Sequence, residues 1–400
     1  MDPYDFESRL ARPVRLKRQE LEQNDRLKHV IFSAQFDREL LEYLESVADM
    51  VRLLAKSKDG SEFLASLLHH KRAMLYFTQP STRTFLSFMA ACQILGVTCN
   101  EVRDPAVSSE AKGESPFDSI RVFSSYFDVI IMRSVVANFA ECCAYLMNDL
   151  DEFNQRSVPI VNGGSGADQH PTQALLDVYT IQRTFQFIDP KDSSRWTRFD
   201  ELRQKHPELT RGLDGKVYGF CGDIGRGRTV RSLAELLALY DDATMVFIAP
   251  EHPRLQLGND LRTRLLELGV KFHEVPSFDA RIDGRPAIEM LDCLYMTRIQ
   301  AEHDTVEDRA TFGRIDFQQY HLTRQLVARM KDYAPILHPF PRVGEIPYEI
   351  DTDPRAMYFR QARNGMWIRA ALLAYLFDVD GKIANHYRKA FAEFHHYNVV

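Results

Sequence analysis

The sequence lacks the features that mark several large classes of protein. No stretch is long and apolar enough to span a bilayer. The chain has a net charge of −6 and contains no long run of lysine and arginine. We therefore expect no membrane-spanning segment and no nucleic-acid partner. The chain has no internal repeat and no low-complexity segment. Small molecules are the partners that this composition favours.

Cysteine is also scarce, and its positions lack the paired spacing of a metal site. We predict that the cysteines are reduced core residues, because several lie in apolar strand or helix patterns. The six are Cys92, Cys99, Cys142, Cys143, Cys221 and Cys293. The N-terminal residues are acidic and have no apolar core segment, so we expect no signal peptide and predict a cytoplasmic protein.

The 400 residues are 45% hydrophobic and 26% charged, enough for two domains with separate cores. Strand patterns alternate with helix patterns, which predicts an α/β protein whose two domains are each a parallel-sheet unit with helices on both faces. The predicted boundaries are an N-terminal arm at 1–29, a first domain at 30–184, an insertion or linker at 185–213, a second domain at 214–362, and a C-terminal helix at 363–400 that packs back between the domains.

The stretch from Ala73 to Phe88 is the one around which the first domain is organised. An apolar strand pattern, Ala73–Phe77, leads into Ser-Thr-Arg-Thr at 81–84, and apolar residues then recur at helical spacing. The backbone N–H groups of this first helical turn are unpaired, and with hydroxyl groups and a guanidinium they suit a phosphate. The alternative is an ordinary cap of a buried helix, since serine and threonine are common caps.

Further elements of the first domain carry polar residues at their ends. A helix is predicted from Val30 to Leu54, and another from Pro116 to Tyr126. Arg133 ends a buried-strand pattern, at the edge where parallel sheets bind ligands. His170 precedes a helix, whose N-terminus disfavours an imidazolium and keeps a neutral ring as a donor; a capping or core-edge histidine is the alternative.

The second domain opens with a strand at 217–221, a glycine-rich turn at 222–229 and a helix through Leu239. The glycine spacing is not G-x-G-x-x-G, and no acidic residue closes the next strand about 20 residues on, so the signal for a dinucleotide is weak. Two more strand patterns end in polar residues, at 293–300 and 335–343. A last helix is predicted at 364–377, apolar on most faces.

Seven motifs follow one another in an order that resembles the aspartate carbamoyltransferase family, within the aspartate/ornithine carbamoyltransferase superfamily. They are Ser81-Thr-Arg-Thr84, Ser108-Ser-x-x-Lys-Gly-Glu-Ser115, Met132-Arg133, His170-Pro-Thr-Gln173, Gly227-Arg-Thr229, Tyr295-Met-Thr-Arg-x-Gln300 and His338-Pro-x-Pro-Arg342. The resemblance covers roughly Val30 to Phe377.

The resemblance implies transfer of the carbamoyl group of carbamoyl phosphate to the amino group of L-aspartate. The products are N-carbamoyl-L-aspartate and phosphate, the committed step toward pyrimidines. Such a reaction needs fixed donors for a dianionic phosphate and a developing oxyanion, and we expect no metal, no cofactor and no covalent nucleophile. The first domain would bind carbamoyl phosphate and the second aspartate.

The family's roles are carried over by residue. Ser81, Thr82, Arg83 and Thr84 would hold the phosphate, and Arg133 would serve both phosphate and carbonyl. His170 and Thr84 would donate to the carbonyl oxygen. The carbamoyl NH₂ would be bound by Gln173 and by backbone carbonyls around Pro339 and Phe340.

Two carboxylates of aspartate would meet Arg228 on one side and Arg298 with Gln300 on the other. Lys112, with Ser108, would reach in from a neighbouring subunit of a homotrimer or a higher assembly of trimers. The catalytic residues implied are Arg83, Thr84, Lys112, Arg133 and His170.

The chain departs from the family pattern at three places. Arg226 adds a cation that tunes carboxylate binding or faces solvent. Gly344 stands where many relatives carry an acidic residue and predicts a more mobile loop, although Glu345 is kept. The extra segment at 185–213 would lie beside the first strand of the second domain, and it affects which other chains dock there rather than the reaction.

The alternatives are a carbamoyltransferase acting on ornithine, a nucleotide-dependent dehydrogenase, and a silent homologue. The pair of Arg298 and Gln300 suits a carboxylate better than the amine of ornithine.

Overall fold

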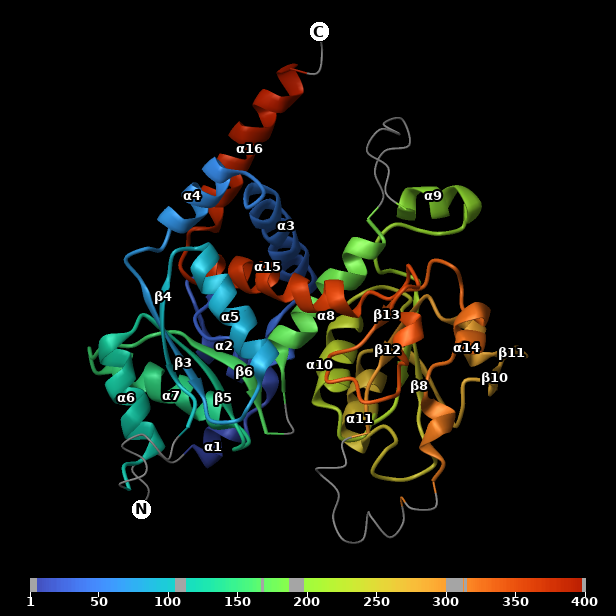
Figure 1. Cartoon of the computed structure of the whole chain (residues 1–400). Coiled ribbons are helices and arrows are strands. Elements are labelled where there is room, and N and C mark those ends of the chain that lie inside the picture. The colour runs from blue at the N-terminus through green and yellow to red at the C-terminus, as the bar shows by residue number, and fades with distance from the viewer. Residues whose placement is uncertain are drawn as a thin grey trace. The chain divides into compact units, whose positions relative to one another are not determined.

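Alternation of strand and helix along the chain produces two parallel sheets, one in each of two units. The structure is a computed structural model that describes residues 6–104, 113–166, 169–186, 198–299, 312 and 315–397 (Figure 1). Unit 1 comprises Met1–Leu176 and Arg363–Val400, and unit 2 comprises Asp177–Ala362. The predicted fold class, parallel-sheet α/β in two parts, is confirmed.

The sheet of unit 1 has the strand order β4-β3-β5-β6, with every pair parallel. Its strands are β3 (Arg72–Phe77), β4 (Thr98–Val102), β5 (Val129–Ser134) and β6 (Ile160–Ser165). Strands β5 and β6 are buried throughout, as expected of central strands covered on both faces. The chain adds β4 on one side of β3 and β5 on the other, so β3 and β5 flank the topological switch point, where open α/β sheets bind ligands.

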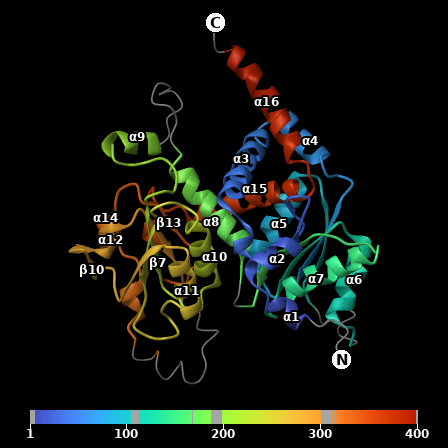
Figure 2. The ribbon, with the colours of Figure 1, turned by 180° about the vertical axis from the view of Figure 1, so that it is seen from behind.

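Helices cover both faces of this sheet. Met74 and Tyr76 pack with α7, which lies in front of the strands in Figure 2, whereas Phe77 meets Phe85 of α5 on the opposite face. The helices of unit 1 before the crossing are α1 (Glu7–Leu10), α2 (Val14–Leu21), α3 (Arg38–Leu54), α4 (Lys58–Ser66), α5 (Thr82–Ile94), α6 (Pro116–Tyr126) and α7 (Phe139–Glu152).

The predicted start of α3 at Val30 is wrong. The helix begins at Arg38, because the Asp37 carboxylate caps it by accepting the Leu40 N–H at 2.9 Å. Val30 instead forms a parallel bridge with Val161, and residues Ser33–Gln35 form a short 3-10 helix. The prediction thus placed Val30, which pairs with β6, in the helix that follows Val30 in the sequence.

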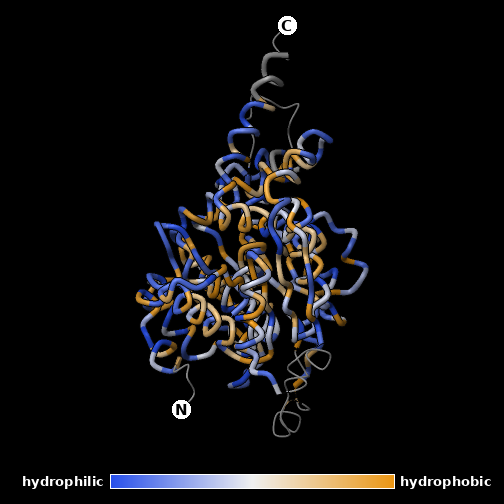
Figure 3. The backbone as a smooth tube through the Cα atoms, turned by 90° about the vertical axis from the view of Figure 1, so that its left-hand side faces the viewer, coloured by the Kyte–Doolittle hydropathy of each residue, from blue (hydrophilic) through white to orange (hydrophobic). Residues whose placement is uncertain are grey.

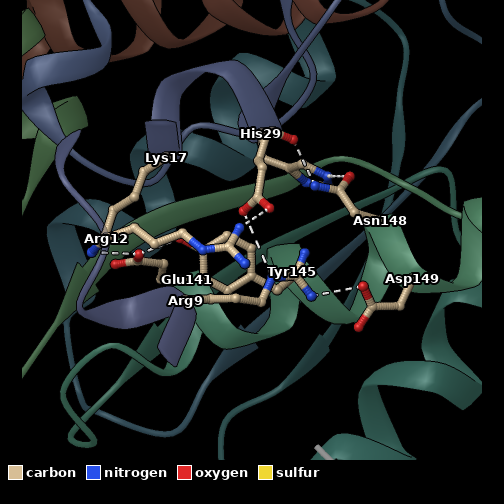
Figure 4. A network of polar contacts seen from close by, with 9 residues as sticks. Arg9, Arg12, Lys17, His29, Glu141, Tyr145, Asn148 and Asp149 are labelled. Carbon is tan, nitrogen blue, oxygen red and sulfur yellow. Dashed lines mark hydrogen bonds and ion pairs between the residues drawn. The ribbon is translucent and has the colours of Figure 1, made fainter. Parts of the chain in front are cut away.

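The N-terminal segment packs on α7 through the polar network of Figure 4. Lys17 lies 2.7 Å from the buried Glu141, which also accepts the Tyr145 hydroxyl at 2.6 Å. Arg9 stacks over the Tyr145 ring and bonds Asp149 at 2.7 Å. The segment continues into a two-stranded hairpin of β1 (Glu22–Gln23) and β2 (Arg26–Leu27).

Two long helices carry the chain across the boundary between the units. The chain leaves unit 1 within α8 (Pro171–Thr184) and returns within α15 (Tyr358–Leu376). The last helix, α16 (Asp380–Tyr397), lies along α3 and buries Ile383. The coloured turns of the chain below the C-terminus in Figure 3 carry both hydrophilic and hydrophobic colours. Asp380 is buried and accepts from Arg26 at 2.8 Å, which fixes the start of α16 to the N-terminal hairpin.

The sheet of unit 2 is also parallel, in the order β13-β12-β7-β8-β9. Its strands are β7 (Val217–Cys221), β8 (Thr244–Ile248), β9 (Lys271–Val275), β12 (Cys293–Met296) and β13 (Ile336–Leu337). Strand addition reverses between β7 and β12, which makes these two strands the switch point. Two further short strands, β10 (Arg281–Ile282) and β11 (Arg285–Pro286), form an antiparallel pair.

The helices of unit 2 are short. They are α9 (Arg198–Lys205), α10 (Arg228–Leu237), α11 (Asn259–Glu267), α12 (Ala287–Met290) and α14 (Arg324–Arg329), with 3-10 helices at Phe317–Tyr320 and Tyr348–Ile350. In the described part of the chain, none of the helices has the length and apolarity needed to cross a membrane.

The segment that precedes β7 is attached to the strand by specific bonds. The buried ammonium of Lys216 donates to the Thr210 carbonyl at 3.0 Å, and the Tyr218 hydroxyl donates to the Leu213 carbonyl at 2.6 Å. Burial lowers the pKa of Lys216. All six cysteines are free, and of these Cys99 is half-buried while the others are buried.

Candidate active site

The turn between β3 and α5 forms the N-terminus of α5. Ser81 is the N-cap residue of α5, but its side chain makes no capping hydrogen bond within the described part of the chain. Thr82 and Arg83 are exposed, and Thr84 is buried. The predicted strand, turn and helix are confirmed. An ordinary side-chain cap does not explain Ser81, so its hydroxyl is available for another acceptor or donor.

Arg133 lies within β5, next to this turn. Its side chain is 8% exposed and donates to the Gly163 carbonyl at 3.1 Å. Its backbone carbonyl accepts the Gln79 N–H at 3.2 Å and the Thr78 hydroxyl at 3.3 Å. The turn after β3 is therefore fixed to the end of β5, and a buried guanidinium lies beside it.

His170 lies at the start of α8, as predicted, and is buried. Its carbonyl accepts the N–H groups of Gln173 and Ala174 at 2.9 and 3.2 Å, and its Nε2 lies 3.5 Å from the Thr84 hydroxyl oxygen. Gln173 is also nearly buried, one helical turn further on. The backbone carbonyl of His170 thus begins the helix, and its ring lies beside Thr84.

Gly164 explains how the histidine and the arginine can approach each other. Its φ is +117°, and a Cβ there would lie 2.6 Å from Arg133 Nη1 and 3.3 Å from His170 Cδ2. Only glycine combines this backbone conformation with that space. The structure therefore brings together the hydroxyl of Thr84, the guanidinium of Arg133 and the imidazole of His170 around one glycine.

Sequence reasoning missed a second buried arginine in unit 1. Arg369 of α15 is 2% exposed, donates to the Ser87 hydroxyl at 2.7 Å and stacks over the Phe88 ring. It also bonds the Thr172 hydroxyl at 3.4 Å, which joins α5 to α8. The one signal in the sequence was a charge set in the apolar second half of the helix, between Trp367-Ile368 and Ala370-Ala-Leu-Leu373.

In unit 2, the turn after β7 is held against the end of β12. Gly222 has a φ of +115°, and a Cβ there would lie 2.1 Å from the Thr297 carbonyl oxygen. The Thr297 hydroxyl accepts the Asp223 N–H and donates to the Cys221 carbonyl, both at 3.0 Å. Close contact of two backbones is thus the reason for glycine here, rather than a bound dinucleotide.

Arg226 does not face solvent, so that expectation is wrong. Its side chain is 10% exposed and grips the fully buried Asp223 through Nε at 3.1 Å and Nη2 at 2.7 Å. Such a forked pair fixes the turn and balances the charge of both groups.

Arg228 and Arg298 lie just beyond the ends of the two neighbouring strands at the switch point. Arg228 is the first residue of α10, and Arg298 follows the last residue of β12 by two positions; both are half-buried. Cys221 and Met296, the last residues of the two strands, are paired. Three other predicted site residues, Ser108, Lys112 and Gln300, lie outside the described residues.

The loop after β13 holds the remaining candidates. Pro339 and Phe340 are half-buried, and Phe340 has a φ of +58°, which is rare for a residue with a side chain. The peptide bond from Phe340 to Pro341 is cis. Arg342 pairs with Asp351, whose pKa the guanidinium lowers by its hydrogen bond, so this arginine supports the loop.

Comparison with known families accounts for both units. The family model for the carbamoyl-phosphate-binding domain of aspartate/ornithine carbamoyltransferases matches residues 28–183, and that for the Asp/Orn-binding domain matches residues 214–376. This chain belongs to the aspartate/ornithine carbamoyltransferase family. The family predicted from the seven motifs is thereby confirmed.

Relatives within this family carry the name of the aspartate enzyme. The chloroplastic aspartate carbamoyltransferase of Arabidopsis thaliana is 37% identical over 88% of this chain and 78% of its own length. The catalytic subunit of the enzyme of Chromobacterium violaceum is 36% identical over 87% of this chain and 97% of its own length.

Solved structures agree with these relatives. Aspartate transcarbamoylase of Trypanosoma cruzi in complex with carbamoyl phosphate and aspartate is 30% identical, with a TM-score of 0.70 over 86% of this chain and 95% of its own. The catalytic subunit of M. jannaschii aspartate transcarbamoylase is 33% identical, with a TM-score of 0.67 over 88% of this chain and 98% of its own.

Proposed function

We propose that this family member transfers the carbamoyl group of carbamoyl phosphate to the amino group of L-aspartate, in the pathway to pyrimidines. The observation that carries the proposal is the cluster of Thr84, Arg133 and His170 around Gly164. Its donors match a substrate that combines a phosphate with a carbonyl. The aspartate carbamoyltransferases among the relatives support this activity, and neither ornithine as acceptor nor a nucleotide-dependent dehydrogenase is favoured.

Unit 1 supplies the groups for carbamoyl phosphate. Ser81, Thr82, Arg83 and Thr84 bind the phosphate through hydroxyls, backbone N–H groups and one guanidinium. Arg133 bonds both the phosphate and the carbonyl. His170 and Thr84 donate to the carbonyl oxygen, where negative charge grows as the aspartate amine attacks, and Gln173 binds the carbamoyl NH₂.

Unit 2 supplies the groups for the acceptor and for the amide end of the donor. Arg228 binds one carboxylate of aspartate, and Arg298 with Gln300 binds the other. The backbone carbonyls of Pro339 and Phe340 accept from the carbamoyl NH₂, which offers only donors. Attack by the neutral amine forms a C–N bond, phosphate leaves with the electrons of the C–O bond, and the amine proton passes to the departing phosphate.

The direct test is an end-point assay that offers carbamoyl phosphate with either aspartate or ornithine. We expect N-carbamoyl-L-aspartate and one equivalent of phosphate. Carbamoylated ornithine alone, or no product with either acceptor, would contradict the proposal.

A bisubstrate analogue that joins a phosphonate to aspartate gives a second test. It occupies both anion sites with a single loss of translational freedom, so it should bind far more tightly than aspartate and raise the melting temperature. A crystal structure of the Trypanosoma cruzi enzyme holds such a compound, N-(phosphonacetyl)-L-aspartic acid. An unchanged melting temperature at saturating analogue would show that the double-anion site is absent.

We further propose a homotrimer in which Lys112 and Ser108 complete the site of a neighbouring subunit. Chains carrying Lys112→Ala and chains carrying Arg298→Ala should each be strongly impaired, but mixing them under subunit exchange should restore activity, because some shared sites receive neither lesion. Absence of recovery despite proven exchange would contradict sharing. The domain boundaries drawn from the sequence and a cytoplasmic location stay predictions.

A further inference from the structure

The loop that follows β13 folds around one buried imidazole, that of His338. The Phe340 N–H donates to His338 Nδ1 at 2.8 Å, and His338 Nε2 lies 2.6 Å from the Glu345 carboxylate. The two side chains are 1% and 8% exposed. Both ring nitrogens of His338 are therefore engaged by the same short loop, which runs from His338 to Glu345.

The hydrogen bonds fix the protonation of the ring. A backbone N–H can only donate, so Nδ1 carries no proton, and Nε2 must carry the proton that bridges to Glu345. The ring is neutral and in the Nε2–H form. Glu345 is held in turn, since its second oxygen accepts the Val343 N–H at 3.0 Å and its carbonyl accepts the Leu322 N–H at 2.7 Å.

This arrangement decides where the loop's carbonyl groups point. Phe340 has a left-handed backbone, which costs a residue with a side chain on the order of 1 kcal/mol or more and persists only where the surroundings impose it. The bond to His338 Nδ1 is such a constraint on Phe340. It sets the orientation of the peptide group that contains the Phe340 N–H and the Pro339 carbonyl, and through the backbone of Phe340 that of the Phe340 carbonyl in the next peptide.

A chain of buried hydrogen bonds anchors the histidine itself. The His338 N–H donates to Gln361 Oε1 at 2.8 Å, and Gln361 Nε2 donates to Asp177 Oδ1 at 2.6 Å. The second oxygen of Asp177 accepts the Tyr295 hydroxyl at 2.8 Å. All four side chains are almost wholly buried in unit 2, so the imidazole has a rigid base in the same unit as the loop.

We propose that His338 is a positioning residue for carbamoyl transfer. Its neutral imidazole, backed by Glu345, holds the Pro339 and Phe340 carbonyls where they accept from the carbamoyl NH₂. The inference rests on the proposed function, because that function assigns the two carbonyls their ligand. His338 acts through the loop and does not itself touch the substrate.

Two substitutions test the hydrogen bonds of the two ring nitrogens separately. In His338→Asn the amide oxygen can replace Nδ1 as the acceptor for Phe340, whereas in His338→Gln the amide reaches toward Glu345 and the acceptor for Phe340 is lost. We expect His338→Gln to lower kcat/KM for carbamoyl phosphate by about a hundredfold, the usual cost of misplacing a site by about 1 Å. We expect His338→Asn to lose no more than about tenfold.

Direct binding distinguishes positioning from a merely structural role. Titration with inorganic phosphate and with carbamoyl phosphate should show that His338→Gln keeps its phosphate affinity and loses carbamoyl phosphate affinity about tenfold, one hydrogen bond's worth. Tyr218→Phe is the matched control: it removes a buried hydrogen bond of unit 2 to the Leu213 carbonyl, far along the chain from the loop. It should lower the melting temperature and leave the ratio of the two affinities unchanged.

The outcomes divide cleanly. Equal kinetics of His338→Gln and His338→Asn, or a parallel loss of phosphate and carbamoyl phosphate affinity, overturns the inference. If His338→Gln does not fold, Glu345→Leu replaces it, because leucine offers no acceptor for the Nε2–H of His338, and a wild-type ratio of affinities in that variant overturns the inference equally. A wild-type chain that forms no carbamoyl-aspartate refutes the proposed function instead, which the end-point assay establishes first.

Discussion

The two units place their charged groups at matching points of two similar sheets, but at different depths. In unit 1 the switch point lies between β3 and β5, and Arg133 belongs to β5 itself with 8% of its side chain exposed. In unit 2 the switch point lies between β7 and β12, and Arg228 and Arg298 follow the strands and are half-buried. Unit 1 thus encloses Arg133, although Arg83 of the same unit is exposed, whereas unit 2 presents Arg228 and Arg298 at a rim.

This difference matches the chemistry that we assign to each unit. Donors that stabilise a growing oxyanion are most effective when they are fixed and shielded from water, as Arg133 and His170 are. Groups that recognise the carboxylates of an entering amino acid need selectivity more than burial, which a forked arginine at a rim supplies. Four experiments test how far this contrast extends.

The largest effect is expected from Arg133→Gln. Loss of a buried guanidinium that serves both phosphate and carbonyl should lower kcat/KM by about a thousandfold, about 4 kcal/mol, and should weaken binding of inorganic phosphate as well. Steady-state kinetics and phosphate titration measure both. Arg156→Gln, which removes an arginine that bonds backbone carbonyls elsewhere in unit 1, is the control and should remain active. Near-normal phosphate binding by Arg133→Gln would refute its role in the enclosed site.

Arg298→Ala should have the next largest effect, confined to the acceptor. Loss of a charge-assisted forked contact costs about 3 kcal/mol, about a hundredfold in efficiency toward aspartate, while carbamoyl phosphate binding stays nearly intact. If Arg298 is a surface ion-pair partner, the cost is well under about 1 kcal/mol. Arg262→Ala serves as control, since this exposed arginine of unit 2 pairs with Glu274. Normal use of aspartate by Arg298→Ala would show that Arg298 does not bind aspartate.

Two glycine substitutions compare the switch points directly. In Gly222→Ala the new Cβ meets a backbone carbonyl oxygen that cannot move aside, so we expect a loss of stability of about 3 kcal/mol. In Gly164→Ala it meets the end of the Arg133 side chain, which can shift, so stability falls less and activity falls more. Thermal unfolding and kinetics on both variants check whether Gly222→Ala loses more stability and Gly164→Ala loses more activity. A larger stability loss for Gly164→Ala would contradict it.

The smallest effect concerns two buried histidines, one in each unit. His29, like His338, accepts a backbone N–H at Nδ1, from Ile160 at 3.0 Å, while its Nε2 lies 3.1 Å from the Asn148 amide oxygen. Burial first, then the charge of Lys28, lowers the pKa of His29 to about 3. The folded-state pKa lies below the unfolded value of 6.5. The stability that the neutral His29 side chain contributes is therefore fully present above pH 6.5 and is lost as the pH falls toward 3.

From pH 7 to pH 5.5 this histidine should cost the wild type about 1 kcal/mol of unfolding free energy. His29→Gln cannot titrate, so we expect it to be less stable at pH 7 but to lose less between these two pH values. Denaturant unfolding at both pH values measures the difference. An identical pH dependence in the two proteins would show that His29 is not a neutral buried group.

Local patterns in the sequence determined much of the fold. The helix predicted from Pro116 to Tyr126 has those bounds, and the strand predicted at 217–221 is β7. In both, the signals lie within a few residues of one another: a proline after the Ser115 cap in one, a short apolar run before glycine in the other. The strand, turn and helix around Ser81 followed from the same kind of local information.

Only the tertiary structure decided which distant residues become partners. It also decided which neighbouring charges are buried. Asp223 lies only three residues before Arg226, but the sequence does not distinguish a buried pair from a solvated one, because burial depends on β12 lying beside β7. The start of α3 was misplaced because Val30 pairs with a strand 131 residues away, and His338 gains its role from Glu345 and Gln361 across a folded loop. Burial and hydrogen bonding are properties of the assembled sheets, so they fix charge and tautomer only after the strands have taken their order.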